Sequence, residues 1–125
     1  MYAILAIAFG GALGATSRYG IDRLISRLVP ANFPTGTFVV NLLGCLLIGF
    51  LWGLFERVHI SSTFRLFLFT GFLGGLTTFS TYAREAVQLI RTGDAINGIL
   101  YIVCSNIFGL MMVTVGFFLC YKFFR

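Results

Sequence analysis

The sequence predicts an all-α integral membrane protein with four transmembrane helices, the third of them broken in its middle. The composition indicates the class, because 58% of the 125 residues are hydrophobic and only 10% are charged, with a mean hydropathy of +0.96. Such a chain has too little polar surface for a soluble globule. The length indicates the number of helices, since a helix needs about 20 apolar residues to cross a bilayer core of roughly 30 Å. About four crossings therefore fit, without room for a separate soluble domain.

Four apolar runs match this template and form a single membrane domain over residues 1–125. We expect helices at about 2–28, 35–55, 66–89 and 95–122. No basic residue precedes the first run and no polar domain follows it, so we interpret it as a mature helix rather than a secretory signal. Pro34 stands just before the second run, where proline suits the first turn of a helix.

The third run carries the most informative feature, a pair of adjacent glycines followed by a cluster of hydroxyl side chains. In chain order these residues are Gly74, Gly75, Thr77, Thr78, Ser80 and Thr81. Inside hydrocarbon every backbone N–H and C=O group must be paired, so residues that loosen the backbone are costly unless they line a site or a cavity. We therefore expect a helix break near 74–78 and an ion site beside it.

The basic residues predict how the chain sits in the membrane. They give a net charge of +5, but they lie at the ends of the predicted helices, where flanking cations belong, so nucleic-acid binding is not expected. Alternating crossings place Arg57, Arg65, Lys122 and Arg125 on one side, and Arg23, Arg27 and Arg91 on the other, with Arg18 and Arg84 near that second boundary. Because the balance of Lys and Arg sets orientation, this near tie predicts dual topology and an antiparallel homodimer.

No carboxylate lies in the middle of a predicted helix, because all four acidic residues are at or near segment ends. They are Asp22, Glu56, Glu85 and Asp94. Their positions argue against proton-coupled transport, which ordinarily needs an acid within the membrane. The sequence also shows no set of nucleophile, base and orienting group and no phosphate-binding loop, so we do not expect an enzyme.

Hydrogen-bond donors and aromatic rings remain at membrane depth. They are Asn41, Phe79, Ser80, Thr81, Tyr82, Tyr101, Ser105 and Asn106. An amide or hydroxyl donates to a dehydrated anion without a fixed charge that would trap it, and the positive edge of an aromatic ring adds a weaker attraction. Phe79 and Tyr82 share a helix face, as do Tyr101 and Ser105. The set fits an anion pathway; the alternative is that these groups only hold helices together.

Arg18 follows an apolar run that is shorter than a full crossing. One interpretation is that its side chain extends to the lipid headgroups while its stem stays in the apolar region. The other is that it concentrates anions in a vestibule of the pathway.

Three motifs resemble those of the Fluc (CrcB-type) fluoride channels. They are GGALGATSRY at residues 10–19, PTGTFVVNLLG at 34–44 and GFLGGLTTFSTY at 71–82. The similarity covers essentially the whole chain, and the third motif is highly specific, whereas the first alone is weak.

The resemblance implies a dual-topology homodimer with two antiparallel pores that pass fluoride and reject chloride. It assigns pore roles to Asn41, Phe79, Tyr101 and Ser105, and Arg18 matches an arginine of the first family motif. It also implies a structural sodium ion at the dimer centre, held by the backbone carbonyls of Gly74 and Thr77. The unwound backbone of a broken helix supplies such hard oxygen ligands where carboxylates are missing.

Two positions depart from the family pattern. Tyr82 stands where the family usually has phenylalanine, and Gly109 stands four residues after Ser105, where a hydroxyl residue can occur. A phenol still presents a ring edge but adds an oxygen, so we expect a change in rate or selectivity rather than in the kind of function.

The chemistry of hydrogen fluoride gives such a pore its purpose. The neutral acid crosses membranes, dissociates in a less acidic cytoplasm and is trapped there as the anion, which the membrane potential expels through a passive pore. We therefore expect fluoride export in a bacterial inner membrane. Two alternatives remain. One is a small four-helix multidrug exporter, which would need an acid within the first helix, where none precedes Asp22. The other is a membrane scaffold, which leaves the hydroxyl cluster unexplained.

Overall fold

The computed structural model describes residues 1–125, and every regular element is helical. Three continuous helices are α1 (Tyr2–Leu28), α2 (Thr35–Phe55) and α6 (Ala95–Phe123). The third segment, Ser62–Arg91, is divided into α3 (Ser62–Arg65), η1 (Leu66–Leu73), α4 (Gly74–Leu76) and α5 (Phe79–Arg91). All four segments are long and apolar enough to cross a membrane. The predicted all-α class with four spans and a broken third span is confirmed.

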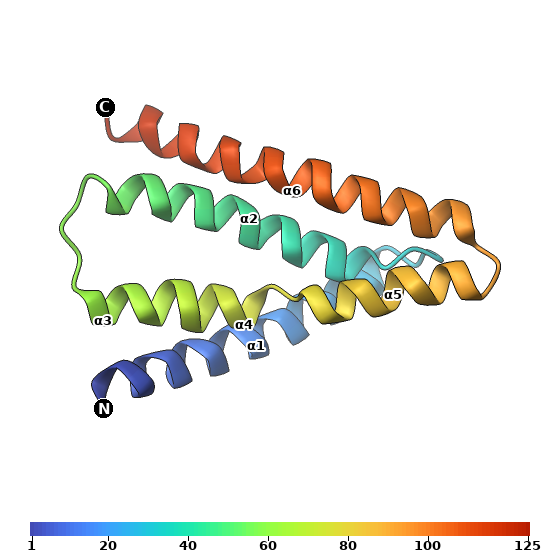
Figure 1. Cartoon of the computed structure of the whole chain (residues 1–125), viewed down its shortest axis with the longest axis horizontal. Helices are drawn as coiled ribbons and strands as arrows, with labels where there is room; N and C mark the ends of the chain where they lie inside the picture. The colour runs from blue at the N-terminus through green and yellow to red at the C-terminus, as the bar shows by residue number, and fades with distance from the viewer.

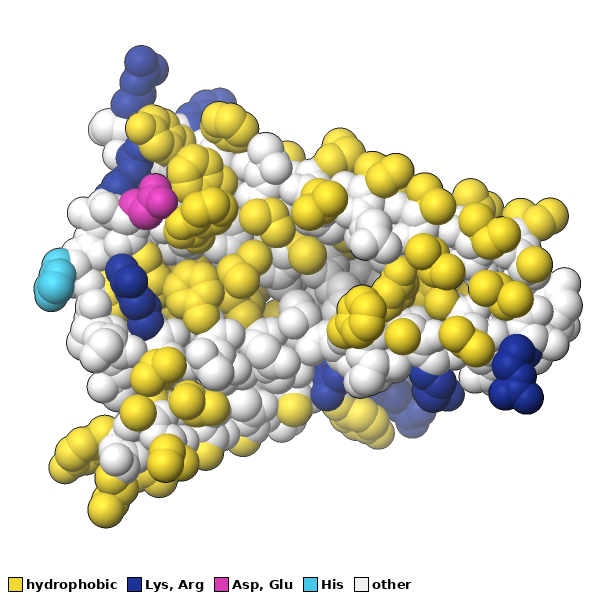
Figure 2. Space-filling model, viewed as in Figure 1, with side chains coloured by type: hydrophobic (Ala, Val, Ile, Leu, Met, Phe, Trp, Pro, Cys, Tyr) yellow, Lys and Arg dark blue, Asp and Glu magenta, His cyan; other side chains and the backbone are white.

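The four segments form two helix pairs that run side by side (Figure 1). α2 packs on α6, and α1 packs on η1 and α4. Both chain termini lie at the same end of the bundle, as an even number of crossings requires. The face in Figure 2 carries apolar side chains along its length, with Lys and Arg side chains near its ends and along one edge. This pattern suits a surface that lipid or another membrane chain covers.

Glycines bring α1 and the third segment into backbone contact. A Cβ placed on Gly14 would collide with the Phe72 carbonyl oxygen, and one on Gly75 would lie 2.6 Å from the Gly11 carbonyl oxygen. Small residues let membrane helices approach this closely, because van der Waals packing rather than the hydrophobic effect drives their association.

The pair of α2 and α6 is closed in the same way. A Cβ on Gly49 of α2 would collide with the Val113 carbonyl oxygen, and one on Gly116 of α6 would collide with the Leu46 carbonyl oxygen. Both helices nevertheless run without interruption from end to end.

The break in the third segment lies at Thr77 and Thr78. Their backbones are extended, with φ −87° and ψ 155° at Thr77 and φ −148° and ψ 118° at Thr78. The helix before the break is wound in π-helical turns over η1, a loosened form that is common near functional sites. The segment begins at Ser62, ahead of the expected start near 66, because the Ser61 hydroxyl accepts a hydrogen bond from the Phe64 amide at 3.3 Å and caps α3.

The break changes the neighbour of the third segment. Before it, Leu73 and Leu76 are buried with Val40 of α2, while η1 and α4 pack along α1. After it, Tyr82 and Ala86 of α5 are buried against Tyr101 of α6. The third segment thereby exchanges α1 for α6 as its main neighbour at the break.

Candidate functional site

Asn41 of α2 pairs the backbone of the break through its side chain, and we call these two hydrogen bonds the Asn41 clasp. Its amide nitrogen donates to the Thr78 carbonyl oxygen at 3.1 Å, and its amide oxygen accepts from the Thr78 N–H at 2.9 Å. The N–H and C=O groups of Thr78 are thereby both hydrogen-bonded although the residue is not helical. In the membrane interior, backbone polar groups require such partners. One N–H of the Asn41 amide remains for another partner.

This clasp releases the carbonyl oxygen of Gly74, the first residue of α4, from helical hydrogen bonding. In a continuous helix the Thr78 amide would bond the Gly74 carbonyl four residues earlier, but here it donates to Asn41. The next carbonyl that leaves the helical direction is that of Thr77, whose backbone is extended. The two carbonyls predicted to bind sodium are therefore at the break, and an uncharged oxygen of this type is a fitting ligand for a hard cation.

Thr78 caps the helix that resumes after the break. Its hydroxyl oxygen accepts from the Thr81 amide at 3.3 Å and donates to the Thr81 hydroxyl at 3.1 Å. Thr77 instead bonds backwards, from its hydroxyl to the Leu73 carbonyl at 2.9 Å. Two of the predicted hydroxyls thus stabilise the two helix ends at the break.

A cavity of about 390 Å³ opens beside the break, and we call it the central cavity. Six predicted site residues line it together: Asn41, Gly74, Thr77, Phe79, Tyr82 and Ser105. Its remaining wall is largely apolar and includes Cys45, Ile48 and Phe69. No carboxylate lines this cavity. It combines a few convergent donors with apolar walls, as small-ligand sites do.

Aromatic rings continue from the central cavity into the bundle. The Phe79 and Tyr82 ring centroids are 5.6 Å apart, and Tyr82 meets Tyr101 edge to face at 5.1 Å. Tyr101 in turn meets Phe33 edge to face at 5.1 Å. The rings of Tyr82 and Tyr101 are buried, whereas Phe79 is 80% exposed and lies at the open side of the cavity.

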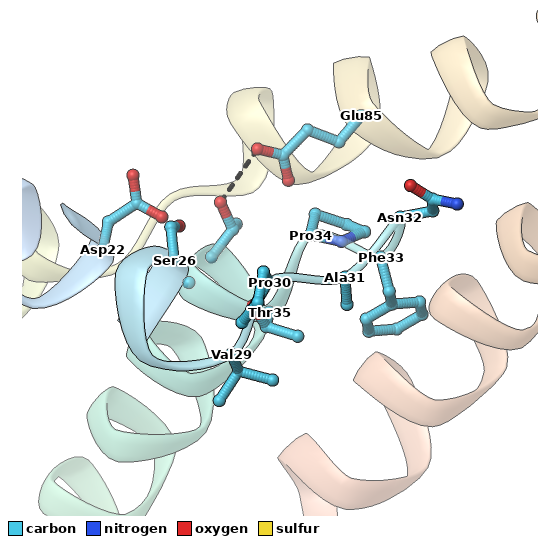
Figure 3. A pocket seen from close by; sticks show the side chains of 12 residues that line it. Asp22, Ser26, Val29, Pro30, Ala31, Asn32, Phe33, Pro34, Thr35 and Glu85 are labelled. Carbon is cyan, nitrogen blue, oxygen red and sulfur yellow. Dashed lines mark hydrogen bonds between the residues drawn. The ribbon is translucent and has the colours of Figure 1, made fainter. Parts of the chain in front are cut away.

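A second hollow of about 490 Å³, here named the outer hollow, lies at the connection between α1 and α2. Figure 3 shows Glu85 of α5 on one side of it and Asp22 and Ser26 of α1 on the other. One Glu85 carboxylate oxygen accepts from the Thr37 hydroxyl at 2.9 Å, and the other accepts from the Tyr101 hydroxyl at 2.9 Å. The fully buried Tyr101 therefore links the outer hollow to the aromatic rings.

Sequence reasoning missed Thr37 and Glu85 as members of the site. Glu85 counts as a segment-end residue in the sequence, yet it lies three residues after Tyr82 and hence on the same face of α5. That spacing was the available signal. Thr37 offered none, because its partner is 48 residues away along the chain.

Arg18 and Thr81 share a third, smaller hollow of about 220 Å³ with Asp22, Thr37 and Thr78. Because Thr37 also lines the outer hollow and Thr78 the central cavity, this hollow lies between the two. Ser80 lies elsewhere: its side chain is exposed on α5 and lines none of the three hollows.

The chain has four segments fit to span a membrane, and three of them, α2, the third segment and α6, line a cavity with hydrogen-bond donors at a helix break. These features define a class, the multi-pass membrane proteins that handle ions at a discontinuous helix. Comparison with known proteins narrows the class. Residues 5–117 match the family described as "CrcB-like protein, Camphor Resistance (CrcB)". The chain belongs to the CrcB family.

Several curated relatives are similar over nearly their whole length. The "Fluoride-specific ion channel FluC" of Desulfotalea psychrophila is 54% identical over 120 residues, 96% of this chain and 93% of the relative. Proteins of the same name are 45% identical in Salinibacter ruber, over 93% of this chain and 87% of the relative, and 47% identical in a Hydrogenobaculum species, over 92% and 94%. These names describe an ion channel, so the expectation of a protein that is not an enzyme is confirmed, as is the resemblance read from the motifs.

Proposed function

We propose that this protein is a fluoride-selective passive ion channel that exports fluoride from the cytoplasm and so relieves fluoride toxicity. The observation that carries the proposal is the central cavity, in which amide, hydroxyl and aromatic groups converge without a carboxylate. Donors without a fixed charge suit a small, strongly hydrated anion, since they replace its water and still let it leave. Relatives named as fluoride-specific channels supply the identity of the anion.

The proposed path enters near Arg18, whose charge raises the local anion concentration, and passes the Thr81 hydroxyl. In the central cavity the free N–H of Asn41, the Ser105 hydroxyl and the ring edges of Phe79 and Tyr82 take over from water. Tyr101 supports this track through its contact with the Tyr82 ring. Ser80, which faces away from the cavity, joins the path only at the surface of a second chain.

The active assembly we propose is an antiparallel homodimer in a bacterial inner membrane, with two pores and with lipid around it. The open side of the central cavity supports this proposal, because the 80% exposed ring of Phe79 and the exposed Ser80 need a cover that lipid does not provide for a polar path. The nearly balanced distribution of basic residues supports both orientations in the membrane.

A structural sodium ion at the dimer centre is part of the same proposal. The carbonyls of Gly74 and Thr77 fit the ion, since the clasp of Asn41 frees the first from helical bonding and the extended backbone exposes the second. Two such carbonyls from each of two chains would surround the ion with uncharged oxygens. When bound, sodium supplies a fixed positive charge that draws the two breaks together.

The test of the function is efflux from liposomes that contain the purified protein and fluoride, with a potassium ionophore to release the membrane potential. We expect rapid loss of fluoride and retention of chloride in a parallel sample. Protein-free liposomes and liposomes with the Asn41→Leu variant serve as controls. Equal loss of both halides, or no fluoride loss from folded protein, would remove the proposal.

Orientation is tested separately, with one cysteine at His59 in the connection between α2 and the third segment and the native cysteines replaced by serine or alanine. In cells, a membrane-impermeant thiol reagent should label about half of the chains from each side. Labelling from one side alone would exclude the antiparallel dimer and leave the channel activity to be judged by flux.

A further inference from the structure

Asn106 is a polar side chain on an exposed face in the middle of the apolar helix α6. Its amide nitrogen donates to the Ile102 carbonyl oxygen at 2.8 Å and to the Tyr82 hydroxyl oxygen at 3.1 Å. Both N–H groups of the amide are therefore used, which is what the membrane requires of a donor without water.

The bond to Ile102 fixes the orientation of this amide. A carbonyl only accepts hydrogen bonds, so the nitrogen of Asn106, and not its oxygen, must face Ile102. The same nitrogen faces the phenol, so the Tyr82 oxygen is an acceptor in this contact. The phenolic proton is left for another partner, because this is the one side-chain hydrogen bond of Tyr82 and the oxygen accepts in it.

The free proton is positioned at the central cavity. Tyr82 is only 9% exposed, and it lines that cavity together with Ser105 and Asn106. On its other sides the ring is held between Phe79 and Tyr101. A buried hydroxyl donor without an acceptor beside a cavity calls for a ligand that accepts hydrogen bonds.

We propose that the Tyr82 hydroxyl is a direct anion-binding donor in the central cavity and that Asn106 is its positioning residue. The inference rests on the proposed function and adds to it a binding device of this chain, where a phenylalanine would offer only a ring edge. Asn106 donates to one lone pair of the phenolic oxygen and so polarises the O–H group, whose proton has no acceptor in this chain and is left for the anion. Fluoride is a stronger hydrogen-bond acceptor than chloride, so the added donor favours retention and selectivity over speed.

The test compares saturation of fluoride flux in liposomes for the native protein, Tyr82→Phe, Asn106→Leu and the double variant. Tyr82→Phe keeps the ring and its packing, and we expect the half-saturating fluoride concentration to rise about tenfold, the equivalent of one lost hydrogen bond to a charged group. Asn106→Leu should shift it in the same direction by a smaller factor. The double variant should match Tyr82→Phe alone, because a positioning residue has nothing left to position.

Tyr121→Phe is the matched control, since Tyr121 lies near the end of α6 under the Arg57 guanidinium and away from the cavity. It should leave the half-saturating concentration unchanged. An unchanged value in Tyr82→Phe, or shifts that multiply in the double variant, would overturn the inference while the channel function stands. A native protein that passes no fluoride would overturn the function itself, so the two failures are distinguishable.

Discussion

The two helix pairs of this bundle are closed by the same kind of glycine contact, here called a glycine seam, but their helices differ in continuity. In both, glycines bring one backbone against the other, with Gly14 and Gly75 in the pair of α1 and the third segment and Gly49 and Gly116 in the pair of α2 and α6. Only the third segment is interrupted. The difference teaches that glycine permits close packing but does not by itself break a membrane helix. A break also needs partners for the backbone groups that it releases, and Asn41 and Thr78 provide them.

The largest difference between the two helix pairs should disappear when the Asn41 clasp is removed. Asn41→Leu leaves the N–H and C=O groups of Thr78 unpaired, each at about 1–3 kcal/mol, so we expect a loss of about 2–6 kcal/mol in stability together with loss of fluoride flux. Thermal unfolding in detergent and liposome efflux measure the two effects. Asn97→Leu is the control, because Asn97 bonds only Asp94 at the start of α6. A stable Asn41→Leu variant with normal flux would show that the break holds itself.

The second experiment compares one glycine from each seam. Gly14→Ala and Gly116→Ala both force a methyl group against backbone, so each should lower stability by about 1–3 kcal/mol. Flux per amount of folded protein should fall steeply in Gly14→Ala, because its contacts are the Phe72 carbonyl oxygen and the Leu76 amide just before the break. In Gly116→Ala it should be largely kept. Equal losses of flux would mean that both pairs shape the pathway alike.

A smaller effect is expected at the cap of α5. Thr78→Val removes the hydroxyl that accepts from the Thr81 amide, and loss of such a cap costs about 1 kcal/mol. Thr114→Val is the matched control, since the Thr114 hydroxyl bonds only the Leu110 carbonyl within α6. Thermal unfolding in detergent should give a lower unfolding temperature for Thr78→Val than for Thr114→Val. Equal unfolding temperatures would show that another acceptor at the break pairs the Thr81 amide in place of the Thr78 hydroxyl.

The smallest effect is expected at Gly109, which lies outside the close backbone contacts between α2 and α6. A Cβ on Gly109 would meet only the Cys45 sulfur at 3.5 Å, an ordinary contact. Gly109→Ala should therefore keep flux and raise stability by about 0.5–1 kcal/mol through its helix propensity. Measured beside Gly116→Ala, it tests whether contact or composition gives a glycine of α6 its importance. A clear destabilisation would extend the seam to this position.

The sequence predicts the architecture well because long apolar runs leave few choices in a membrane. The break is also predictable, since Gly74 and Gly75 precede a cluster of hydroxyl residues. What holds the break is not, because the partner of Thr78 lies 37 residues earlier along the chain. The sequence predicts that the amide of Asn41 serves an anion, and in the structure one of its two N–H groups and its oxygen also pair the backbone of Thr78.

Ser80 and Glu85 show the same limit in the candidate site. Ser80 belongs to the hydroxyl cluster by sequence, but the turn of α5 points it away from the cavity that Phe79 and Tyr82 line. Glu85 belongs to a helix end by sequence, yet its carboxylate is bonded by hydroxyls from two other helices. Sequence patterns indicate which residues are polar at depth, whereas tertiary packing decides which of them meet.

The common position of the two chain termini restricts how copies of this protein can be joined. Because four crossings return the chain to the side on which it began, a flexible soluble linker from one C-terminus to the next N-terminus forces both copies into the same orientation. A tandem of opposed copies needs a linker that itself crosses the bilayer, with about 20 apolar residues. Two gene fusions that differ only in this added crossing would therefore show, by which of them is active, whether the working assembly needs copies in the same or in opposite orientations.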